Sequence, residues 1–253
     1  EAELARREGR SYETGAQLLQ RILETGRGQW MGKGKYKYKE PAAPDTTELP
    51  DLSEGWVWGT FGHLCRVQGG YAFKSADYRP RGVPLVRISN LVNGTVQLEE
   101  DIVFLPDVFL DEFDRFRLEK GDTLIAMSGA TTGKMATFTL DAPALLNQRV
   151  GRFQPTVPSL TVLGYISLLT MRASGKVLAD AYGAAQPNIS PTEIEAMPVG
   201  VPPLAEQNRI VAEVDRRFSL VREVERQIES NLRRSVRLRQ GILHSEFTPL
   251  GAE

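Results

Sequence analysis

The chain has 253 residues, 25% of them charged, and a formal net charge of -1 at pH 7. This length allows one large domain, or one compact domain with an extended element. The only cysteine is Cys65 and the only histidines are His63 and His244, which excludes a disulfide framework or a cysteine/histidine zinc site within the chain. A net charge near zero excludes a uniformly basic surface, but not a local nucleic-acid site.

No apolar run approaches the roughly 18 to 20 residues that a membrane-spanning helix needs, and the first ten residues hold no signal-peptide core. We therefore expect a cytoplasmic protein with no membrane partner. Because the chain begins on Glu1 and not on methionine, we also expect a piece of a longer protein or a processed product.

Residues 1–51 combine one amphipathic segment with a linker. The segment "YETGAQLLQRILET" predicts a helix, and the glycine-, lysine- and proline-rich "GRGQWMGKGKYKYKEPAAPDTTELP" follows it. The linker interleaves lysines with tyrosines at Lys33, Lys35, Tyr36, Lys37, Tyr38 and Lys39. Such a run either keeps a spacer solvated or contacts a phosphate backbone, and the sequence leaves both interpretations open.

Residues 52–202 have the pattern of an α+β domain. The strand candidates are "VPLVRISNLV", "TVQLEEDIVFL", "DTLIAMS", "MATFTL" and "LLNQRVGRFQP", with turn signals at Asn93-Gly94 and Gly121-Asp122. "LTVLGYISLLTMRAS" and "ISPTEIEAM" predict helices, the second with Ser190 as N-cap and Pro191 at the first helical position. Strands in one block with helices at its end indicate an α+β domain and not a βαβ array.

The segment "IAMSGATTGKMATF", residues 125–138, resembles a nucleotide phosphate-binding loop only superficially. Such a loop has the form GxxxxGK[ST] between a strand and a helix. Here the glycine spacing is one residue short, Met135 occupies the position of the metal-binding hydroxyl, and "MATFTL" alternates as a strand does. The sequence therefore argues against a nucleotide site.

Residues 203–247 predict one long helix of the coiled-coil type, followed by a short tail at 248–253. No glycine or proline occurs from Leu204 to Gln240, and about 44 residues at 1.5 Å each would make a rod of roughly 66 Å. We predict an apolar seam formed by Val211, Val214, Phe218, Val221, Ile228, Leu232 and Ile242. A small domain cannot cover such a stripe, so the helix needs a partner helix from a longer chain or a second copy.

The common catalytic motifs are missing. The only Pro-Pro pair, Pro202-Pro203, fits a helix start and not the Asp/Asn-Pro-Pro-Tyr motif of an amino-group methyltransferase. Glu119 and Lys120 are adjacent, so on a strand they would point to opposite faces and could not form a nuclease core. Nearby acids are better explained as a solvated helical face, namely Asp111, Glu112 and Asp114. We expect no catalytic site and no metal site.

Four loops instead collect side chains that suit base edges and phosphates. Arginine pairs with guanine and asparagine or glutamine with adenine, while serine, threonine, lysine and glycine amides suit phosphate. The candidates are Arg87 and Asn90, then Ser128, Thr131, Thr132 and Lys134, then Asn147, Gln148 and Arg149, and finally Gln186 and Asn188. The same residues also suit turn caps and salt bridges within the fold, and spacing alone does not decide between the two interpretations.

Six segments in this order resemble the DNA specificity subunit of type I restriction-modification systems. They are "GGYAFKSADY", "GVPLVRISNLVNG", "GDTLIAMSGATTGK", "ALLNQRVGRF", "AQPNIS" and "PPLAEQNRIVAEVDRRFS". The resemblance runs from about Leu52 to Phe247, and its first segment adds Lys74 to the candidate DNA contacts. The lead-in before Leu52 resembles the segment that joins the two halves of such subunits. The chain therefore looks like the second, C-terminal half.

The resemblance implies a mixed-sheet target recognition domain at 52–202, a long spacer helix at 203–247, and binding to double-stranded DNA. A full subunit holds two such domains apart on two antiparallel helices, where methyltransferase subunits dock, and a motor-nuclease restriction subunit joins them. S-adenosylmethionine would be carried by the methyltransferase, with no cofactor or catalysis in this chain. The partner of the helix seam would be the N-terminal half of the subunit or a second copy of this chain.

Two other hypotheses stay open at this stage. A recognition domain of a self-contained methyltransferase or restriction enzyme would have to bind S-adenosylmethionine, and no glycine-rich cofactor loop supports that hypothesis. A coiled-coil adaptor would show no DNA affinity at any salt concentration.

Overall fold

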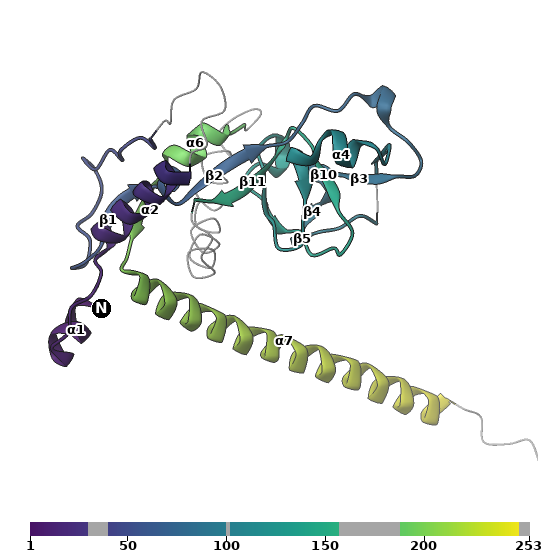
Figure 1. Cartoon of the computed structure of the whole chain (residues 1–253). Helices are drawn as coiled ribbons and strands as arrows, with labels where there is room; N and C mark the ends of the chain where they lie inside the picture. Colours follow the sequence, from purple (N-terminus) through teal and green to yellow (C-terminus); the bar gives the residue numbers. More distant parts are fainter. Residues whose placement is uncertain (30–39, 100–101, 157–187, 248–253) are drawn as a thin grey trace, which may run out of the picture. The chain divides into compact units, whose positions relative to one another are not determined.

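The computed structural model describes residues 1–29, 40–99, 102–156 and 188–247 (Figure 1). Several sequence predictions fall outside these residues: the lysine run of the linker, the helix predicted from "LTVLGYISLLTMRAS", the position of Gln186 and the side chain of Ile242. The chain divides into two compact units, Glu1–Asn208 and Arg209–Glu253. Among the described helices, none combines the length and the apolar character needed to cross a membrane.

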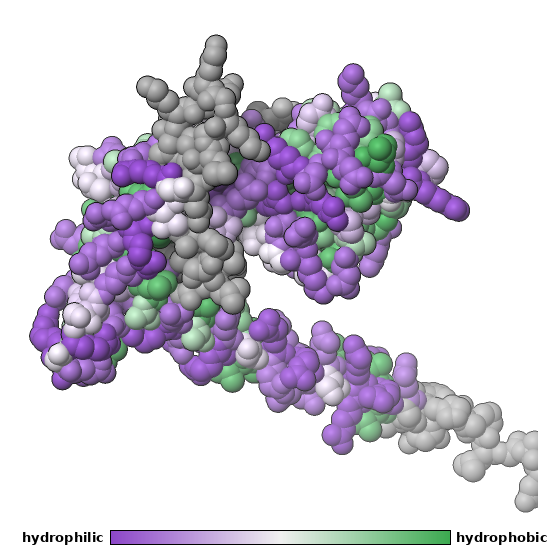
Figure 2. All heavy atoms as spheres, in the orientation of Figure 1, coloured by the Kyte–Doolittle hydropathy of each residue, from purple (hydrophilic) through white to green (hydrophobic). Residues whose placement is uncertain are grey.

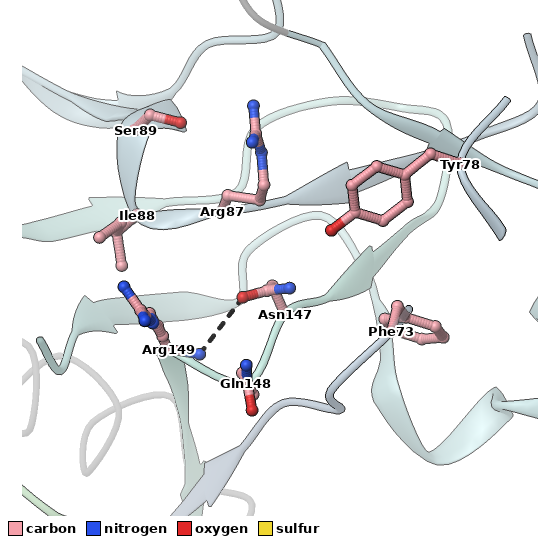
Figure 3. Close-up of a pocket in the computed structure, with 8 residues that line it drawn as sticks. All are labelled: Phe73, Tyr78, Arg87, Ile88, Ser89, Asn147, Gln148 and Arg149. Atoms are coloured by element: carbon pink, nitrogen blue, oxygen red, sulfur yellow. Dashed lines mark hydrogen bonds between the residues drawn. The ribbon is translucent and has the colours of Figure 1, made fainter. Parts of the chain in front are cut away.

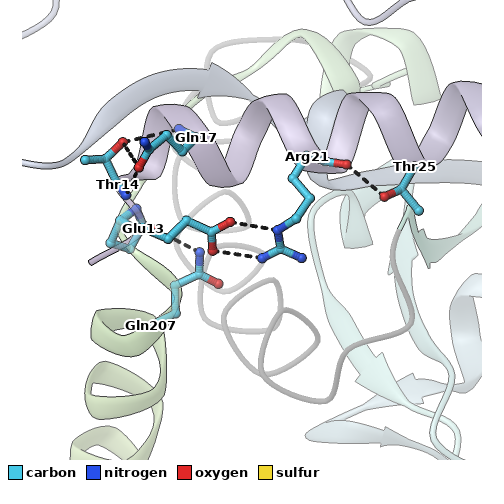
Figure 4. Close-up of polar contacts among 7 residues, drawn as sticks. Glu13, Thr14, Gln17, Arg21, Thr25 and Gln207 are labelled. Atoms are coloured by element: carbon cyan, nitrogen blue, oxygen red, sulfur yellow. Dashed lines mark hydrogen bonds and ion pairs between the residues drawn. The ribbon is translucent and has the colours of Figure 1, made fainter. Parts of the chain in front are cut away.

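The first unit begins with two helices, α1 (Ala2–Glu8) and α2 (Gly15–Gln29). Helix α2 confirms the helix predicted from the amphipathic segment. A reciprocal cap starts it: the Gln17 N–H donates to Thr14 Oγ1 at 3.3 Å, and the Thr14 N–H donates to Gln17 Oε1 at 2.9 Å (Figure 4). One turn further on, Arg21 pairs with Glu13 at 2.7 Å. Helix α2 therefore carries its own start signal.

Helix α2 packs on an antiparallel pair of strands, β1 (Val57–Thr60) and β12 (Pro198–Val201). Leu18 and Ile22 share one buried core with β12, α3 (Phe61–Leu64) and α6 (Pro191–Ala196). The approach is close, because a Cβ added at Gly15 would lie 2.0 Å from the Val201 carbonyl oxygen. Residues on both sides of the predicted boundary at residue 52 therefore pack together in one core. The division into a lead-in (1–51) and a recognition domain (52–202) stays a prediction about function.

A six-stranded sheet has the order β2-β11-β8-β9-β5-β4. Its strands are β2 (Cys65–Gly69), β11 (Val150–Pro155), β8 (Thr123–Ala126), β9 (Met135–Thr137), β5 (Gly94–Val96) and β4 (Leu91–Val92). Strands β5 and β9 are parallel and the other neighbours antiparallel. At the predicted Asn93-Gly94 turn both residues have positive φ, 49° and 80°, as a tight hairpin requires.

A four-stranded sheet has the order β6-β3-β10-β7, in which β3 and β10 are parallel. Its strands are β6 (Phe104–Leu105), β3 (Val83–Val86), β10 (Ala144–Leu146) and β7 (Arg117–Leu118). The short helices of this region are η1 (Ser75–Asp77), η2 (Ile88–Asn90), α4 (Phe109–Glu112), η3 (Asp114–Phe116) and η4 (Gly129–Thr131). Both larger sheets are mixed, which confirms the predicted α+β class with mixed sheets.

Three local predictions can be compared with these elements. Helix α6 has the predicted cap, in which the Glu193 N–H donates to Ser190 Oγ at 3.2 Å. The acids Asp111, Glu112 and Asp114 are exposed, as expected of a solvated face. The continuous strand candidate "LLNQRVGRFQP" is wrong: it divides into β10 and β11, which belong to different sheets.

Helix α7 (Leu204–Phe247) confirms the predicted uninterrupted helix of 44 residues. Its apolar side chains alternate with charged ones along the surface (Figure 2). From Phe218 to Leu232 the predicted seam is exposed in this single chain: Val221 is 52%, Ile228 60% and Leu232 63% accessible, while Val211 and Val214 are half-buried. Exposed Val224 and Val236, which the prediction omitted, add to the apolar surface. Glu213 pairs with Arg216 and Arg217, and these hydrogen bonds lower the pKa of Glu213 to about 2.

Candidate nucleic-acid interface

Three strand ends bring the candidate loops together. Strands β3 and β10 are parallel neighbours, so their carboxyl ends lie at one edge and are followed by Arg87 and Asn147. Strand β8 ends at Ala126, and the next residue, Met127, donates its N–H to the Arg149 carbonyl at 2.9 Å. Loops that are about 20 to 60 residues apart in sequence therefore meet at one place.

All four backbone N–H groups of the turn at 147–150, between β10 and β11, are hydrogen-bonded. The N–H groups of Asn147 and Gln148 donate to the carbonyls of Val86 (3.1 Å) and Tyr71 (3.0 Å). The Arg149 N–H donates to the side-chain oxygen of Asn147 at 3.4 Å, and the Val150 N–H donates to the Asn147 carbonyl at 2.9 Å. The backbone is thus fixed while the side chains of Gln148 and Arg149 remain exposed.

Gly70 makes this anchoring possible. Its N–H donates to the Val150 carbonyl at 3.1 Å. A Cβ at this position would lie 2.3 Å from the carbonyl oxygens of both Leu146 and Asn147. Only glycine therefore fits beside the turn without moving it.

Arg152 links the two sheets directly after the turn. Its side chain is 12% accessible, and the guanidinium donates to the Arg117 carbonyl on β7 at 2.6 Å and to Gln68 Oε1 on β2 at 2.7 Å. It also pairs with Asp122 at 3.2 Å. A charge buried with several partners in this way fixes the relative position of the strands, so the turn rests on a rigid base.

A recess of about 340 Å³ opens beside the turn (Figure 3). The described residues that line it are Phe73, Tyr78, Arg87, Ile88, Ser89, Asn147, Gln148 and Arg149. They bring two guanidinium groups and two amides next to an aromatic wall, and none of them is a carboxylate. The sequence prediction included the arginines and amides and missed Phe73 and Tyr78. The only signal for these two was their position in "GGYAFKSADY".

The glycine-rich loop lies against the same region. Asn188 pairs with Ser128 as a β-bridge, and the Ile189 N–H donates to the Met127 carbonyl at 2.9 Å. Gly129 lies beside Ile88 of the recess, with 3.7 Å between the Ile88 Cδ1 atom and a Cβ built on the glycine. The hydroxyls of Ser128 and Thr131 are buried without a hydrogen-bond partner among the described residues.

The structure gives two candidate residues positions inside the fold. Asn90 is 1% accessible, and its side chain accepts from the Arg87 N–H at 2.9 Å and donates to the Gln97 carbonyl at 3.1 Å. Thr132 is 2% accessible and donates its hydroxyl to the Gly129 carbonyl at 2.7 Å. Lys74 and Lys134 are exposed and do not line the recess. Asn90 and Thr132 therefore hold the shape of their own loops.

His63 lies in α3 and Cys65 begins β2; both are buried, and neither lines the recess. His63 Nδ1 accepts the Thr60 N–H at 3.0 Å, and burial lowers the pKa of this histidine from its ordinary value. Burial raises the pKa of the Cys65 thiol, which leaves it neutral. Within the described part of the chain, no group of three or more His, Cys, Asp or Glu side chains is placed to hold a metal ion.

The sequence profile of the type I restriction modification DNA specificity domain matches residues 53–234, which is more than half of the chain. The chain belongs to this family. Two relatives are specificity subunits of type I restriction enzymes. The EcoAI subunit of Escherichia coli is 27% identical over 213 residues, covering 80% of this chain and 35% of the relative. The MjaVIII subunit of Methanocaldococcus jannaschii is 26% identical over 205 residues, covering 78% and 47%.

Solved structures of type I systems share the specificity-domain fold. A chain from a study of complex assembly and conformational transition of the type I R-M system superposes with a TM-score of 0.58 at 20% identity, covering 90% of this chain and 52% of that one. The HsdS subunit from Thermoanaerobacter tengcongensis gives 0.52 at 17% identity, covering 89% and 49%. This specificity-domain chain spans about a third to a half of the length of its curated relatives.

Proposed function

We propose that this chain binds double-stranded DNA in a sequence-specific way and supplies one half of the specificity subunit of a type I restriction-modification complex. In this proposal residues 52–202 form the target recognition domain and residues 203–247 the spacer helix. Residues 1–51 form the lead-in helix and linker, and residues 248–253 a tail. The chain would read one half of a bipartite site and place the methyltransferase and restriction subunits on it.

The observation that carries the proposal is the convergence of side chains at the ends of β3, β8 and β10. Base recognition needs donors and acceptors held on a rigid frame, since each loosely held side chain loses entropy on binding. The turn at Asn147 meets this need, because all four of its backbone N–H groups are hydrogen-bonded while the side chains of Gln148 and Arg149 are exposed. Arg87 and Asn188 come from the neighbouring loops, and Lys74 and Lys134 would contact phosphates at the margin.

The chemistry of methylation and cleavage belongs, in this proposal, to partner subunits. The chain itself would carry no cofactor, and S-adenosylmethionine would be bound by the methyltransferase subunit. The exposed seam of α7 supports a protein partner, because a helix that keeps Val221, Ile228 and Leu232 more than half accessible is incomplete as a single element. That partner would be the N-terminal half of a specificity subunit or a second copy of this chain.

A gel-shift titration of the chain against a pool of duplexes tests the proposal, with the methyltransferase subunit added and omitted. We expect retardation that weakens steeply with salt, since phosphate contacts release counterions. A subset of duplexes should remain bound at a salt concentration where most of the pool has dissociated from the chain. Absence of DNA binding at every salt concentration, with and without the partner, would favour the protein adaptor and refute the proposal. Methyl transfer by the chain alone would favour a self-contained enzyme.

A further inference from the structure

We infer that Arg149 reads the major-groove edge of a guanine, and that the half-site bound by this chain therefore contains a G·C pair that depends on this arginine. The inference rests on the proposed function. The inference adds to the proposed function the identity of the base that one residue of the recess contacts.

The first argument is the rigidity of the turn that carries Arg149. Both backbone groups of this residue are engaged: its N–H with the side chain of Asn147 at 3.4 Å and its carbonyl with the Met127 N–H at 2.9 Å. The neighbouring N–H groups of the turn are also bonded. Because the backbone is fixed before binding, the guanidinium loses only side-chain entropy when it meets a base.

The second argument is the state of the guanidinium. Arg149 is exposed, and within the described part of the chain no hydrogen bond or ion pair engages its side chain. Arg152, three residues later, is the opposite case, with four hydrogen bonds from its guanidinium to protein groups. One arginine is committed to the fold and the other is presented to a ligand. In Figure 3 the Arg149 side chain rises from the turn toward Ile88 at the recess.

The third argument is the chemical match between the recess and the four bases. In the major groove guanine shows two acceptors, O6 and N7, which a guanidinium fork binds with two parallel hydrogen bonds. Cytosine shows an amino donor and needs a carboxylate or another acceptor. The described lining supplies two guanidinium groups and no carboxylate. A guanidinium has only donors, so Arg149 itself fits guanine and disfavours cytosine at the position that it contacts.

A phosphate is the competing ligand for an exposed arginine, and two changes separate it from a base. Lysine keeps the charge that attracts phosphate but lacks the planar fork that binds guanine. On the DNA side, 7-deazaguanine removes the N7 acceptor and keeps the phosphates and the base pairing. Arg149→Lys and this base analogue therefore test the same contact from its two sides.

The experiment selects a random duplex library with the full chain and the methyltransferase subunit, then measures binding with each guanine of the enriched site replaced in turn by 7-deazaguanine. Wild type should lose about tenfold to a hundredfold in affinity at one guanine. Arg149→Lys should bind the unmodified site that much more weakly and show no further loss with the analogue there. The matched control is Arg81→Lys. Arg81 is an exposed arginine that precedes β3, at the opposite end of this strand from Arg87, so the variant should bind as wild type does.

Three results would overturn the inference. If an enriched site is found but the analogue affects wild type and Arg149→Lys equally at every guanine, another residue reads the guanines and the proposed function stands. If Arg149→Ala weakens binding to all duplexes alike and Arg149→Lys restores it, Arg149 contacts phosphate. If no site is enriched although the chain and its partner assemble, the proposed function fails together with the inference.

Discussion

Replacing Gly70 with alanine tests whether the turn at Asn147 is held in place by the close packing described above. An alanine Cβ would lie 2.3 Å from two backbone carbonyl oxygens, about 0.7 Å closer than the 3.0 Å below which real Cβ contacts essentially never fall. The obstacle is backbone and not a flexible side chain, so either strand β2 or the turn must move. Such overpacking costs about 1 to 3 kcal/mol of unfolding free energy.

The adjacent Gly69 provides a matched control for this substitution. A Cβ there would meet only Met127 Cε at 3.7 Å and Pro191 Cγ at 3.9 Å, which are ordinary van der Waals contacts. Urea unfolding should therefore show Gly70→Ala destabilised and Gly69→Ala within about 0.5 kcal/mol of wild type. A gel-shift titration should also show that Gly70→Ala loses discrimination between the selected site and random DNA. Equal stability and equal discrimination for the two variants would refute the account of the turn.

Three further predictions concern other parts of the chain. Lys134→Ala should weaken binding to all duplexes alike and lower the slope of log affinity against log salt by about 1, measured by titration at several salt concentrations; a change in sequence preference would contradict a phosphate contact. Burial holds the folded-state pKa of His63 below 6.5, so as the pH falls through 6.5 the unfolded chain takes up a proton at this residue and the folded chain does not. The free energy of unfolding should therefore decrease as the pH is lowered past 6.5. His63→Gln should flatten this pH dependence, measured by urea titrations at several pH values. The α7 seam should pair two copies of the chain antiparallel, since each apolar side chain buried in the pair adds roughly 1.5 to 3 kcal/mol. Val221→Asp or Leu232→Asp would bury an unpaired carboxylate, so each variant should sediment as a monomer. A wild-type chain that stays monomeric at tens of micromolar would exclude self-pairing.

The sequence predicted the features that depend on local chemistry. The cap at Ser190, the Asn93-Gly94 hairpin and the unbroken α7 each follow from residues within a few positions of one another, so a linear reading is sufficient. The sequence also singled out four candidate loops, from side chains that suit base edges and phosphates. Their function as DNA contacts stays a prediction.

The features that depend on distant pairing were not predictable in this way. The parallel pairing of β3 with β10 joins segments about 60 residues apart and leaves no local signal. Without it, nothing indicated that Asn147 interrupts a strand and carries the chain from one sheet to the other. The sequence gives no local signal for Phe73 and Tyr78, which the fold places in the wall of the recess. Asn90 and Thr132 show the reverse case, in which a residue type suited to DNA is engaged within its own loop.

Selection of a random duplex library by the wild-type chain and by the double variant Gln148→Ala, Arg149→Ala tests the central claim most directly, with the methyltransferase subunit present in both cases. The account predicts that wild type enriches a short defined motif. The double variant should bind total DNA with a similar salt dependence and enrich that motif weakly or not at all. Enrichment of the same motif by both proteins would contradict the assignment of the turn as a base-reading element, and the absence of any motif with wild type would contradict sequence-specific DNA recognition itself.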